Sequence, residues 1–163
     1  MPASTASPAT ATIGPTASRL SLTLPSAIKA SSFLIDGEAV IARDDGTPDF
    51  HALRSKRRGH EAVLFAFDLI EHNGADLRDL PLIERKRRLA RLLGRAKHAI
   101  RFVEHLTDDG PTVFDHVCRM GLEGIVSKRT DAPYRSGPSK VWIKSKNPAS
   151  EAVRREREED WNS

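Results

Sequence analysis

Two stretches of alternating side chains constrain most strongly what this chain can fold into. Residues 33–42 and 62–71 each predict a β-strand, because apolar residues recur at every second position and therefore share a face. In the first stretch the apolar face is formed by Phe33, Ile35, Ala39 and Ile41. The opposite face carries the carboxylates of Asp36 and Glu38. Such a face suits either a solvated edge strand or a strand that lines a polar pocket.

The second stretch is largely apolar on both faces, which predicts a central strand. One face is formed by Val63, Phe65, Phe67 and Leu69, and the other by Leu64, Ala66, Asp68 and Ile70. A phenylalanine in such a strand is usually part of a core. The alternative is that one ring, of Phe65 or of Phe67, is a stacking platform for a nucleobase.

Two predicted helices follow, separated by a short predicted strand at residues 100–104. The first helix begins at Pro81 and ends at Gly94. Its apolar side is formed by Leu82, Ile83, Leu89, Leu92 and Leu93. Its basic side carries Arg85, Lys86, Arg87, Arg88 and Arg91 and is expected to be a solvated surface or a nucleic-acid contact. The second helix begins at Pro111, ends at Gly121, and is expected to turn Val113, Phe114, Val117 and Met120 inward.

A carboxylate and a pair of lysines lie near the end of the chain, in the segments Glu123-Gly-Ile-Val-Ser-Lys128 and Trp142-Ile-Lys-Ser-Lys146. Read as strands, the first places Glu123, Ile125 and Ser127 on one face, and the second does the same for Trp142, Lys144 and Lys146. Two ammonium groups on one face repel each other unless water or an anion lies between them. The pattern fits a solvated hairpin, or a metal-binding acid and two lysines around a polyphosphate.

The composition of the whole chain agrees with an anionic partner. The 163 residues carry a net charge of +4 and have a pI near 9.5, which favours nucleic acid or nucleotide over a membrane. The single cysteine, Cys118, excludes an internal disulfide and fits a cytoplasmic location. Residues 1–31 are rich in Ala, Ser, Thr and Pro and are expected to be disordered or weakly ordered. Residues 149–163 predict a charged helix after Asn147-Pro148.

With these residues in hand, the chain resembles the adenylation domain of ATP-dependent DNA ligases, especially the bacterial end-joining type. Five segments carry the resemblance in the family's order. They are Ile35-Asp-Gly-Glu-Ala-Val40, Phe67-Asp-Leu-Ile70, Leu77-Arg-Asp-Leu-Pro-Leu-Ile-Glu-Arg-Lys86, and the two segments with the glutamate and the lysines. The resemblance covers residues 32–148, which are expected to form a partial adenylation domain. It implies an α+β, ATP-grasp-like nucleotidyltransferase fold with antiparallel sheets flanked by helices.

The resemblance also implies roles for particular residues. Glu38 is expected to accept hydrogen bonds from the ribose, and Phe67 to stack on the adenine. Glu123 is expected to bind Mg2+. Lys144 and Lys146 are expected to hold the α-phosphate of ATP, the electrostatic work that phosphoryl-type transfer requires. Lys128 is expected to add positive charge nearby, and basic surface residues to contact double-stranded DNA at nicks or ends.

One element of the family's pattern is absent from this sequence. The family attacks ATP with the lysine of a Lys-x-Asp-Gly signature, and no such signature occurs here. Asp36-Gly37 is preceded by Leu34, and Lys29, in the context Lys-Ala-Ser-Ser, does not match. Only about seventeen residues follow Lys146, too few for the OB-fold domain of complete ligases. The expected fold therefore lacks its N-terminal part and that domain.

Two functions remain open at this stage. In the first, which the resemblance implies, the chain is expected to be an ATP-dependent DNA ligase family protein that acts in nick sealing through an AMP intermediate, in DNA repair and recombination, but does not adenylate itself alone. Alternatively, it is a non-catalytic ATP- and DNA-binding module or the remnant of a truncated ligase gene. In either case a second polypeptide could supply the missing parts, including the nucleophilic lysine. Whether the chain alone is an enzyme is not decided by its residues.

Overall fold

The fold was analysed in a computed structural model of the chain, which describes residues 28, 30–42, 49, 52, 58, 61–94, 100–137, 139–150 and 153–154. Two compact units are present, residues 1–104 and 105–163, and each is considered by itself. The expectations for most of residues 1–31, including Lys29, and for most of the charged C-terminal helix lie outside the described residues. Their boundaries at residues 31 and 149 stay predictions.

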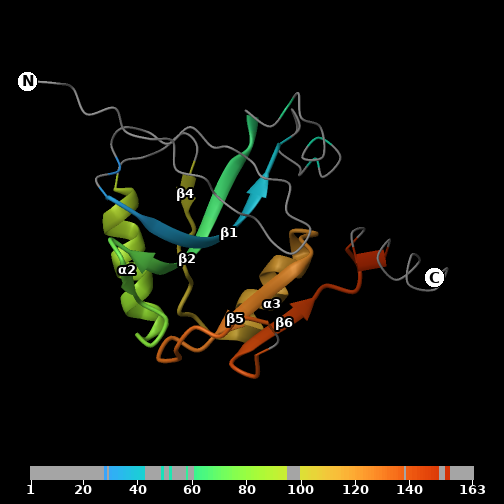
Figure 1. The fold of residues 1–163 in the computed structure, drawn as a ribbon. Coiled ribbons are helices and arrows are strands. Elements are labelled where there is room, and N and C mark those ends of the chain that lie inside the picture. Colours follow the sequence, from blue (N-terminus) through green and yellow to red (C-terminus); the bar gives the residue numbers. More distant parts are fainter. Residues whose placement is uncertain are drawn as a thin grey trace, which may run out of the picture. The chain divides into compact units, whose positions relative to one another are not determined.

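Unit 1 is built on a four-stranded sheet (Figure 1). Its two long strands, β1 (Phe33–Val40) and β2 (Val63–His72), pair antiparallel and confirm the two strands expected from alternation. The short β3 (Ala75–Asp76) also pairs antiparallel with β2, after the turn at Asn73 and Gly74. The fourth strand, β4 (Ile100–Phe102), pairs parallel with β2. The sheet is therefore antiparallel except at this one pair.

The pairing of β1 with β2 is interrupted at two places by an extra residue on β2. The register passes from Asp36↔Asp68 directly to Gly37↔Ala66, so that the pairing skips Phe67. A second shift leaves out Ile70 in the same way. An extra residue on one strand is a β-bulge, which bends the strand and changes the direction of the side chain there.

The core of unit 1 lies between β2 and the helix α2 (Leu82–Leu93). Three of its side chains, Leu69, Leu89 and Ile100, are essentially inaccessible to water. Burial of each contributes roughly 1.5–3 kcal/mol relative to exposure. The helix ends at Gly94, whose N–H donates to the carbonyl of Ala90 at 2.9 Å and whose φ is +47°. A residue with that φ is typically glycine, because it has no Cβ to clash with the backbone.

The sequence prediction for the basic side of α2 is wrong for two of its members. Arg85 and Lys86 are buried, with 1% and 7% of their surface exposed, whereas Arg87 and Arg91 are exposed as expected. Burial of a guanidinium or an ammonium is costly unless partners replace its water. Both side chains have such partners on β2, which periodicity alone does not reveal.

Unit 2 contains the helix α3 (Gly110–Arg119) and a hairpin of β5 (Gly124–Lys128) and β6 (Trp142–Lys146). Asp109 caps the helix, because its carboxylate accepts hydrogen bonds from the backbone and the hydroxyl of Thr112. Val113, Phe114 and Val117 are half-buried, as expected for an inward side. Met120 is 60% exposed, so the expectation that it faces inward is wrong. It follows Arg119, the last helical residue.

No helix in the described parts of the chain has the length and apolar character needed to cross a lipid bilayer.

Candidate nucleotide site

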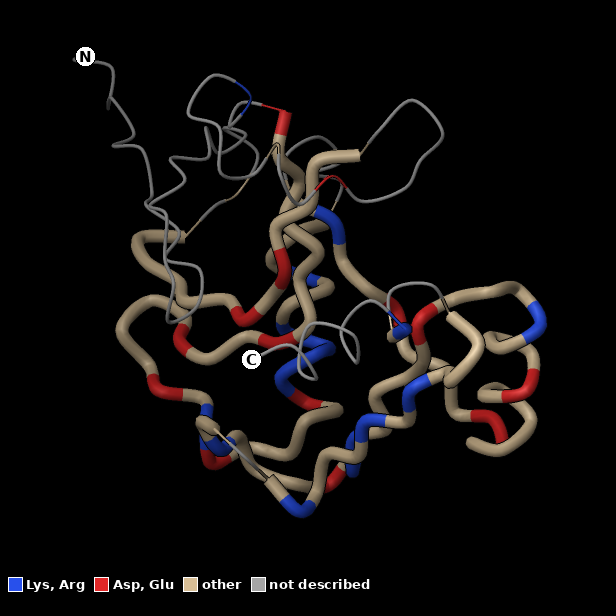
Figure 2. Tube along the Cα trace, turned by 90° about the vertical axis from the view of Figure 1, so that its right-hand side faces the viewer, with Lys and Arg blue, Asp and Glu red and all other residues tan. Residues whose placement is uncertain are grey.

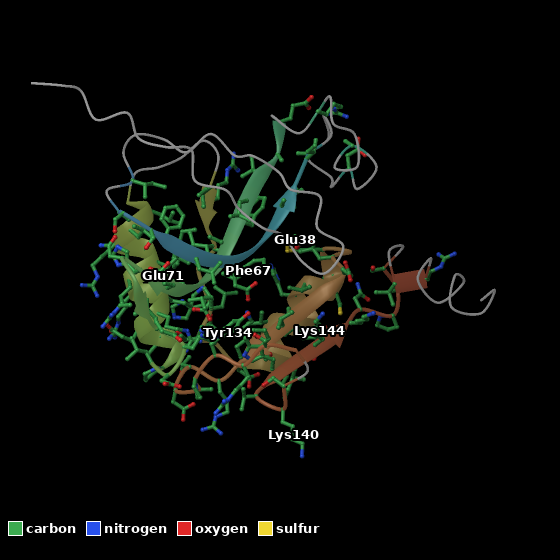
Figure 3. The ribbon with its side chains drawn as sticks, in the orientation of Figure 1. Glu38, Phe67, Glu71, Tyr134, Lys140 and Lys144 are labelled. Carbon is green, nitrogen blue, oxygen red and sulfur yellow. The ribbon has the colours of Figure 1, made fainter. Side chains whose placement is uncertain are left out.

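Glu38 and Phe67 come from adjacent strands of unit 1 (Figure 3). Glu38 is exposed and stands directly opposite Phe65, so these two side chains share a face of the sheet. Phe65 and Phe67 are half-buried and alternate with buried residues that point toward α2. The two rings and the carboxylate are thus available on the sheet face away from the core. The structure brings Glu38 and Phe67 together within one surface.

The backbone of β1 approaches β2 unusually closely beside this face. A Cβ added to Gly37 would lie 2.5 Å from the carbonyl oxygen of Phe65 and 3.2 Å from the Cα of Ala66. Real Cβ atoms do not come that close, so only glycine fits without a shift of backbone. Gly37 precedes Glu38 and pairs with Ala66, next to the bulge at Phe67. The glycine therefore permits the strand geometry that carries both candidate residues.

Two buried side chains of α2 hold the backbone around Phe67, and sequence reasoning missed them. Arg85 forms two parallel hydrogen bonds with Asp68, Nε to Oδ1 at 2.9 Å and a guanidinium nitrogen to Oδ2 at 2.8 Å. Lys86 donates its ammonium to the carbonyl of Phe67 at 3.2 Å and to that of Val103 at 2.9 Å. The signal that could have found them is the lone Asp68 in an otherwise apolar strand. A buried carboxylate requires a partner.

The hairpin of unit 2 places three lysines on one face. The register pairs Lys128 with Trp142, Val126 with Lys144 and Gly124 with Lys146. Residues paired directly across an antiparallel ladder share a face, so Lys128 joins the lysine pair there. The ammonium of Lys128 lies 4.0 Å from the centre of the Trp142 ring, a cation–π contact. Tyr134 packs edge-on against the same ring at 5.9 Å.

The carboxylate predicted to accompany the lysines precedes the hairpin. Gly124, the first residue of β5, has a φ of +150°, and a Cβ there would lie 2.1 Å from the carbonyl of Ser145. Ile125 and Ser127 alternate with the residues paired to the lysines and so face the other way. Among the described residues, no ion pair joins Glu123 to Lys144. Lys144 is exposed.

Asn147 holds the backbone at Glu123. The backbone N–H of Asn147 donates to the carbonyl of Glu123 at 2.7 Å, and its side-chain amide donates to that of Leu122 at 2.9 Å. Asn147 is only 2% exposed, and its side-chain oxygen accepts from the N–H of Ala149 at 3.0 Å. The sequence predicted Asn147 only as the start of a helix. Its further role in the hairpin required knowledge of the strand register.

The described residues contain no group of three or more His, Cys, Asp or Glu side chains that could hold a metal by themselves. Mg2+ is commonly held by one or two carboxylates together with substrate phosphates and water. The exposed carboxylate of Glu123, together with lysines of the following hairpin that attract phosphate, fits that mode. A dedicated metal site made only of protein ligands does not fit the described residues.

The comparisons agree with the fold and with the motifs. Residues 7–146 match the family model described as ATP dependent DNA ligase domain. The chain is 42% identical over 116 residues to the multifunctional non-homologous end joining protein LigD of Pseudomonas aeruginosa, covering 69% of this chain and 14% of that protein. It is 35% identical over 117 residues to the prophage-derived DNA ligase-like protein LigB of Bacillus subtilis, covering 68% of this chain and 43% of LigB.

Solved structures give the same result. Mycobacterial DNA ligase D complexed with ATP and MES is similar with a TM-score of 0.59 and 30% identity, covering 70% of this chain and 38% of that one. The ligase domain of Mycobacterium tuberculosis LigD gives a TM-score of 0.58 at 30% identity, covering 70% of this chain and 37% of that one.

The fold class expected from the sequence is therefore confirmed: these small sheets and two helices are those of a nucleotidyltransferase, or adenylation, domain. Within that class, the chain belongs to the ATP-dependent DNA ligase domain family. It spans less than half the length of the relatives described above. The family match also begins at residue 7, within the low-complexity N-terminal stretch.

Proposed function

We propose that this chain provides nucleotide-binding parts of an ATP-dependent DNA ligase that seals nicks or ends during DNA repair and recombination. Family membership and the similarity to LigD proteins support this function. The observation that carries the proposal is the pairing of β1 with β2, which puts Glu38 and the bulged Phe67 on one exposed sheet face. A cytoplasmic location, where ATP and DNA meet, is part of the proposal.

In unit 1, Glu38 and Phe67 bind the nucleoside. A carboxylate is an acceptor for two ribose hydroxyls, and an aromatic ring contributes a stacking surface for any base. Glu38 is exposed and Phe67 is half-buried, so neither side chain is fully enclosed in the core. Selectivity for adenine over other bases must come from further contacts, because stacking alone does not distinguish purines.

In unit 2, Lys144 and Lys146 bind the phosphates, and Lys128 adds charge on the same face. Ammonium groups that already face one way need little rearrangement to meet the charge that develops as pyrophosphate leaves. The contact with Trp142 restricts Lys128 to one side of the ring. Glu123 would hold Mg2+ together with the phosphates, and the metal would supply additional charge neutralisation.

DNA contacts in this proposal come from exposed basic side chains. Arg87 and Arg91 lie on the exposed side of α2, apart from the buried Arg85 and Lys86. Basic and acidic positions are interspersed along the described chain (Figure 2). Exposed arginines of this kind make salt-sensitive contacts with the phosphate backbone, which position the protein without reading bases.

This chain alone does not carry out the first chemical step of the family. That step forms a bond between a lysine nitrogen and the α-phosphorus of ATP and releases pyrophosphate, and the sequence holds no Lys-x-Asp-Gly. A second polypeptide that carries this lysine would complete the reaction. Incubation of the chain with α-labelled ATP and Mg2+ is expected to give no labelled protein on a denaturing gel. A labelled band that disappears when Lys29 is replaced with alanine would contradict the proposal.

The phosphate contacts are tested with tripolyphosphate, which has no base or ribose. Isothermal titration calorimetry is expected to show binding that weakens in Lys144→Ala and in Lys146→Ala. Lys140→Ala is the matched control, since Lys140 is also exposed in unit 2 but lies outside β6 (Figure 3). An equal loss of tripolyphosphate affinity in all three variants would show that binding depends only on the general positive charge of the chain. Binding of neither tripolyphosphate nor ATP by the parent chain would refute the proposed function.

A further inference from the structure

A buried charged cluster lies directly behind the sheet face that carries Phe67. Its members are Asp68 of β2 and Arg85 and Lys86 of α2, all less than a tenth exposed. A buried ion pair of this kind is seldom needed for stability, since a well-packed apolar pair of similar volume is often as stable or more so. The cluster therefore calls for another explanation, and its position next to the bulge suggests one.

The cluster contacts three successive residues of β2, two of them through backbone atoms. Lys86 donates to the carbonyl of Phe67 at 3.2 Å. Arg85 holds the carboxylate of Asp68 through two hydrogen bonds. The Oδ1 atom of that carboxylate also accepts the N–H of Leu69 at 2.8 Å. The bulge at Phe67 is thus held from the α2 side.

Each donor in the cluster is itself fixed by a second contact. Arg85 also donates to the carbonyl of Leu80, just before α2 begins. Lys86 also donates to the carbonyl of Val103, next to β4, and lies 4.9 Å from the centre of the Phe102 ring. The helix start, the end of β4 and the bulge are therefore tied to the same two side chains. A shift at Phe67 would have to break several buried contacts at once.

We propose that Arg85 and Lys86 are positioning residues that hold the Phe67 bulge, and with it the orientation of the Phe67 ring, in the geometry that stacks on a purine. Neither side chain touches the nucleotide; both act through the main chain of residues 67–69. The proposal rests on the assignment of Phe67 as the adenine platform made above. It explains why charged groups occupy this position in the core.

The first test observes the ring without any nucleotide. 4-Fluorophenylalanine is placed at position 67, and its 19F resonance is recorded in the parent, Lys86→Met and Arg85→Lys chains. Lys86→Met removes the donor to the Phe67 carbonyl, and Arg85→Lys keeps the charge but loses the paired hydrogen bonds. We expect one narrow line in the parent and a broadened or split line in both variants. Unchanged lines in both folded variants would overturn the proposal.

Arg88→Met and Arg91→Lys are the matched controls, because they make the same changes on the less buried side of α2. They are expected to leave the 19F line narrow. Circular dichroism of each variant shows whether it is folded. If one of the two buried-site variants does not fold, the other still decides the outcome. A line broadened equally by the control variants would also contradict the proposal, since the effect would not be specific to the cluster.

The second test separates this proposal from the proposed function. In Lys86→Met, the affinity for ATP is expected to fall about tenfold, by the loss of base stacking, while the affinity for tripolyphosphate is unchanged. Lys86→Arg, which keeps donors for the carbonyls, is expected to retain ATP binding. If the parent binds no ATP, the proposed function fails and the 19F result alone decides the positioning role. If the parent binds ATP and Lys86→Met binds it equally well, only the positioning role fails.

Discussion

Gly37 of β1 lies so close to Phe65 of β2 that an added Cβ would come within 2.5 Å of the Phe65 carbonyl oxygen. The contact is between backbones and cannot be relieved by rotation of a side chain. It occurs between the residue before Glu38 and a ring beside Phe67. The spacing of the two long strands is therefore set at the place where the nucleoside contacts are proposed to lie.

Replacing Gly37 with alanine is expected to destabilise the chain by about 1–3 kcal/mol, because one strand must move away from the other. Urea unfolding followed by circular dichroism measures the change. Gly110→Ala is the control, since a Cβ at Gly110 of α3 meets nothing within 4 Å. A Gly37→Ala chain as stable as Gly110→Ala would show that the close approach is not maintained in solution.

Gly124→Ala is expected to lower the free energy of unfolding by about 1–3 kcal/mol more than Gly121→Ala does. Both glycines have positive φ, at +150° and +71°, so alanine is strained at either position. Only Gly124 adds a clash, because its Cβ would meet the Ser145 carbonyl, whereas the space at Gly121 is open. Equal losses of unfolding free energy would contradict the tight pairing of β5 with β6.

Arg85→Met is expected to destabilise the chain by about 3–5 kcal/mol, because it leaves the buried Asp68 carboxylate without its guanidinium partner. The double variant Asp68→Leu with Arg85→Met should lose less stability than Arg85→Met alone, since no charge is then left buried. A double-mutant cycle in urea measures the difference. If the double variant is less stable than the single one, the ion pair contributes to stability in a way that the structure does not explain.

The ion pair of Glu84 with Arg88 is expected to weaken at acid pH. The hydrogen bond from Arg88 lowers the pKa of the Glu84 carboxyl below its ordinary value, and Arg91 and Arg87 contribute in the same direction. Because the folded-state pKa is the lower one, the stabilisation is present above the ordinary Glu pKa and is lost as pH falls through the lowered value.

Glu84→Gln should therefore remove a small part of the acid sensitivity of unfolding while leaving the stability near pH 7 almost unchanged, because the pair is surface-exposed. Thermal unfolding of parent and variant between pH 3 and pH 7, a range that covers the titration of Glu carboxyls, measures this. An identical pH profile in both chains would contradict the pairing.

Periodicity was sufficient to predict the two long strands and the two helices of this fold, but not the short β3 or the geometry at the site. The alternation in β1 and β2 and the prolines that begin the two helices depend on local sequence, and those elements are present. The bulge at Phe67 depends on how two distant strands pair. The parallel pairing of β4 with β2 likewise has no local signal.

The buried positions of Arg85 and Lys86 were missed for a similar reason. On a helix, a basic side is usually solvated, and the basic residues of α2 were taken together as one such side. The helical spacing nevertheless places Arg85 on the stripe of Leu82, Leu89 and Leu93, and Arg88 away from it. The partners that accompany this burial are Asp68 and the carbonyl of Phe67, both on another element. Motif resemblance predicted which residues matter, whereas the structure supplies what holds them in place.

Calorimetric titration with ATP of the Phe67→Leu and Phe65→Leu chains tests the central claim most directly. Leucine keeps the apolar volume in either position but removes the aromatic face, and both rings are half-buried on the same strand. We expect the affinity of Phe67→Leu for ATP to fall about tenfold or more, that of Phe65→Leu to change little, and tripolyphosphate binding to be unaffected in both. Unchanged ATP binding by Phe67→Leu, or an equal loss in Phe65→Leu, would contradict the assignment of Phe67 as the adenine platform.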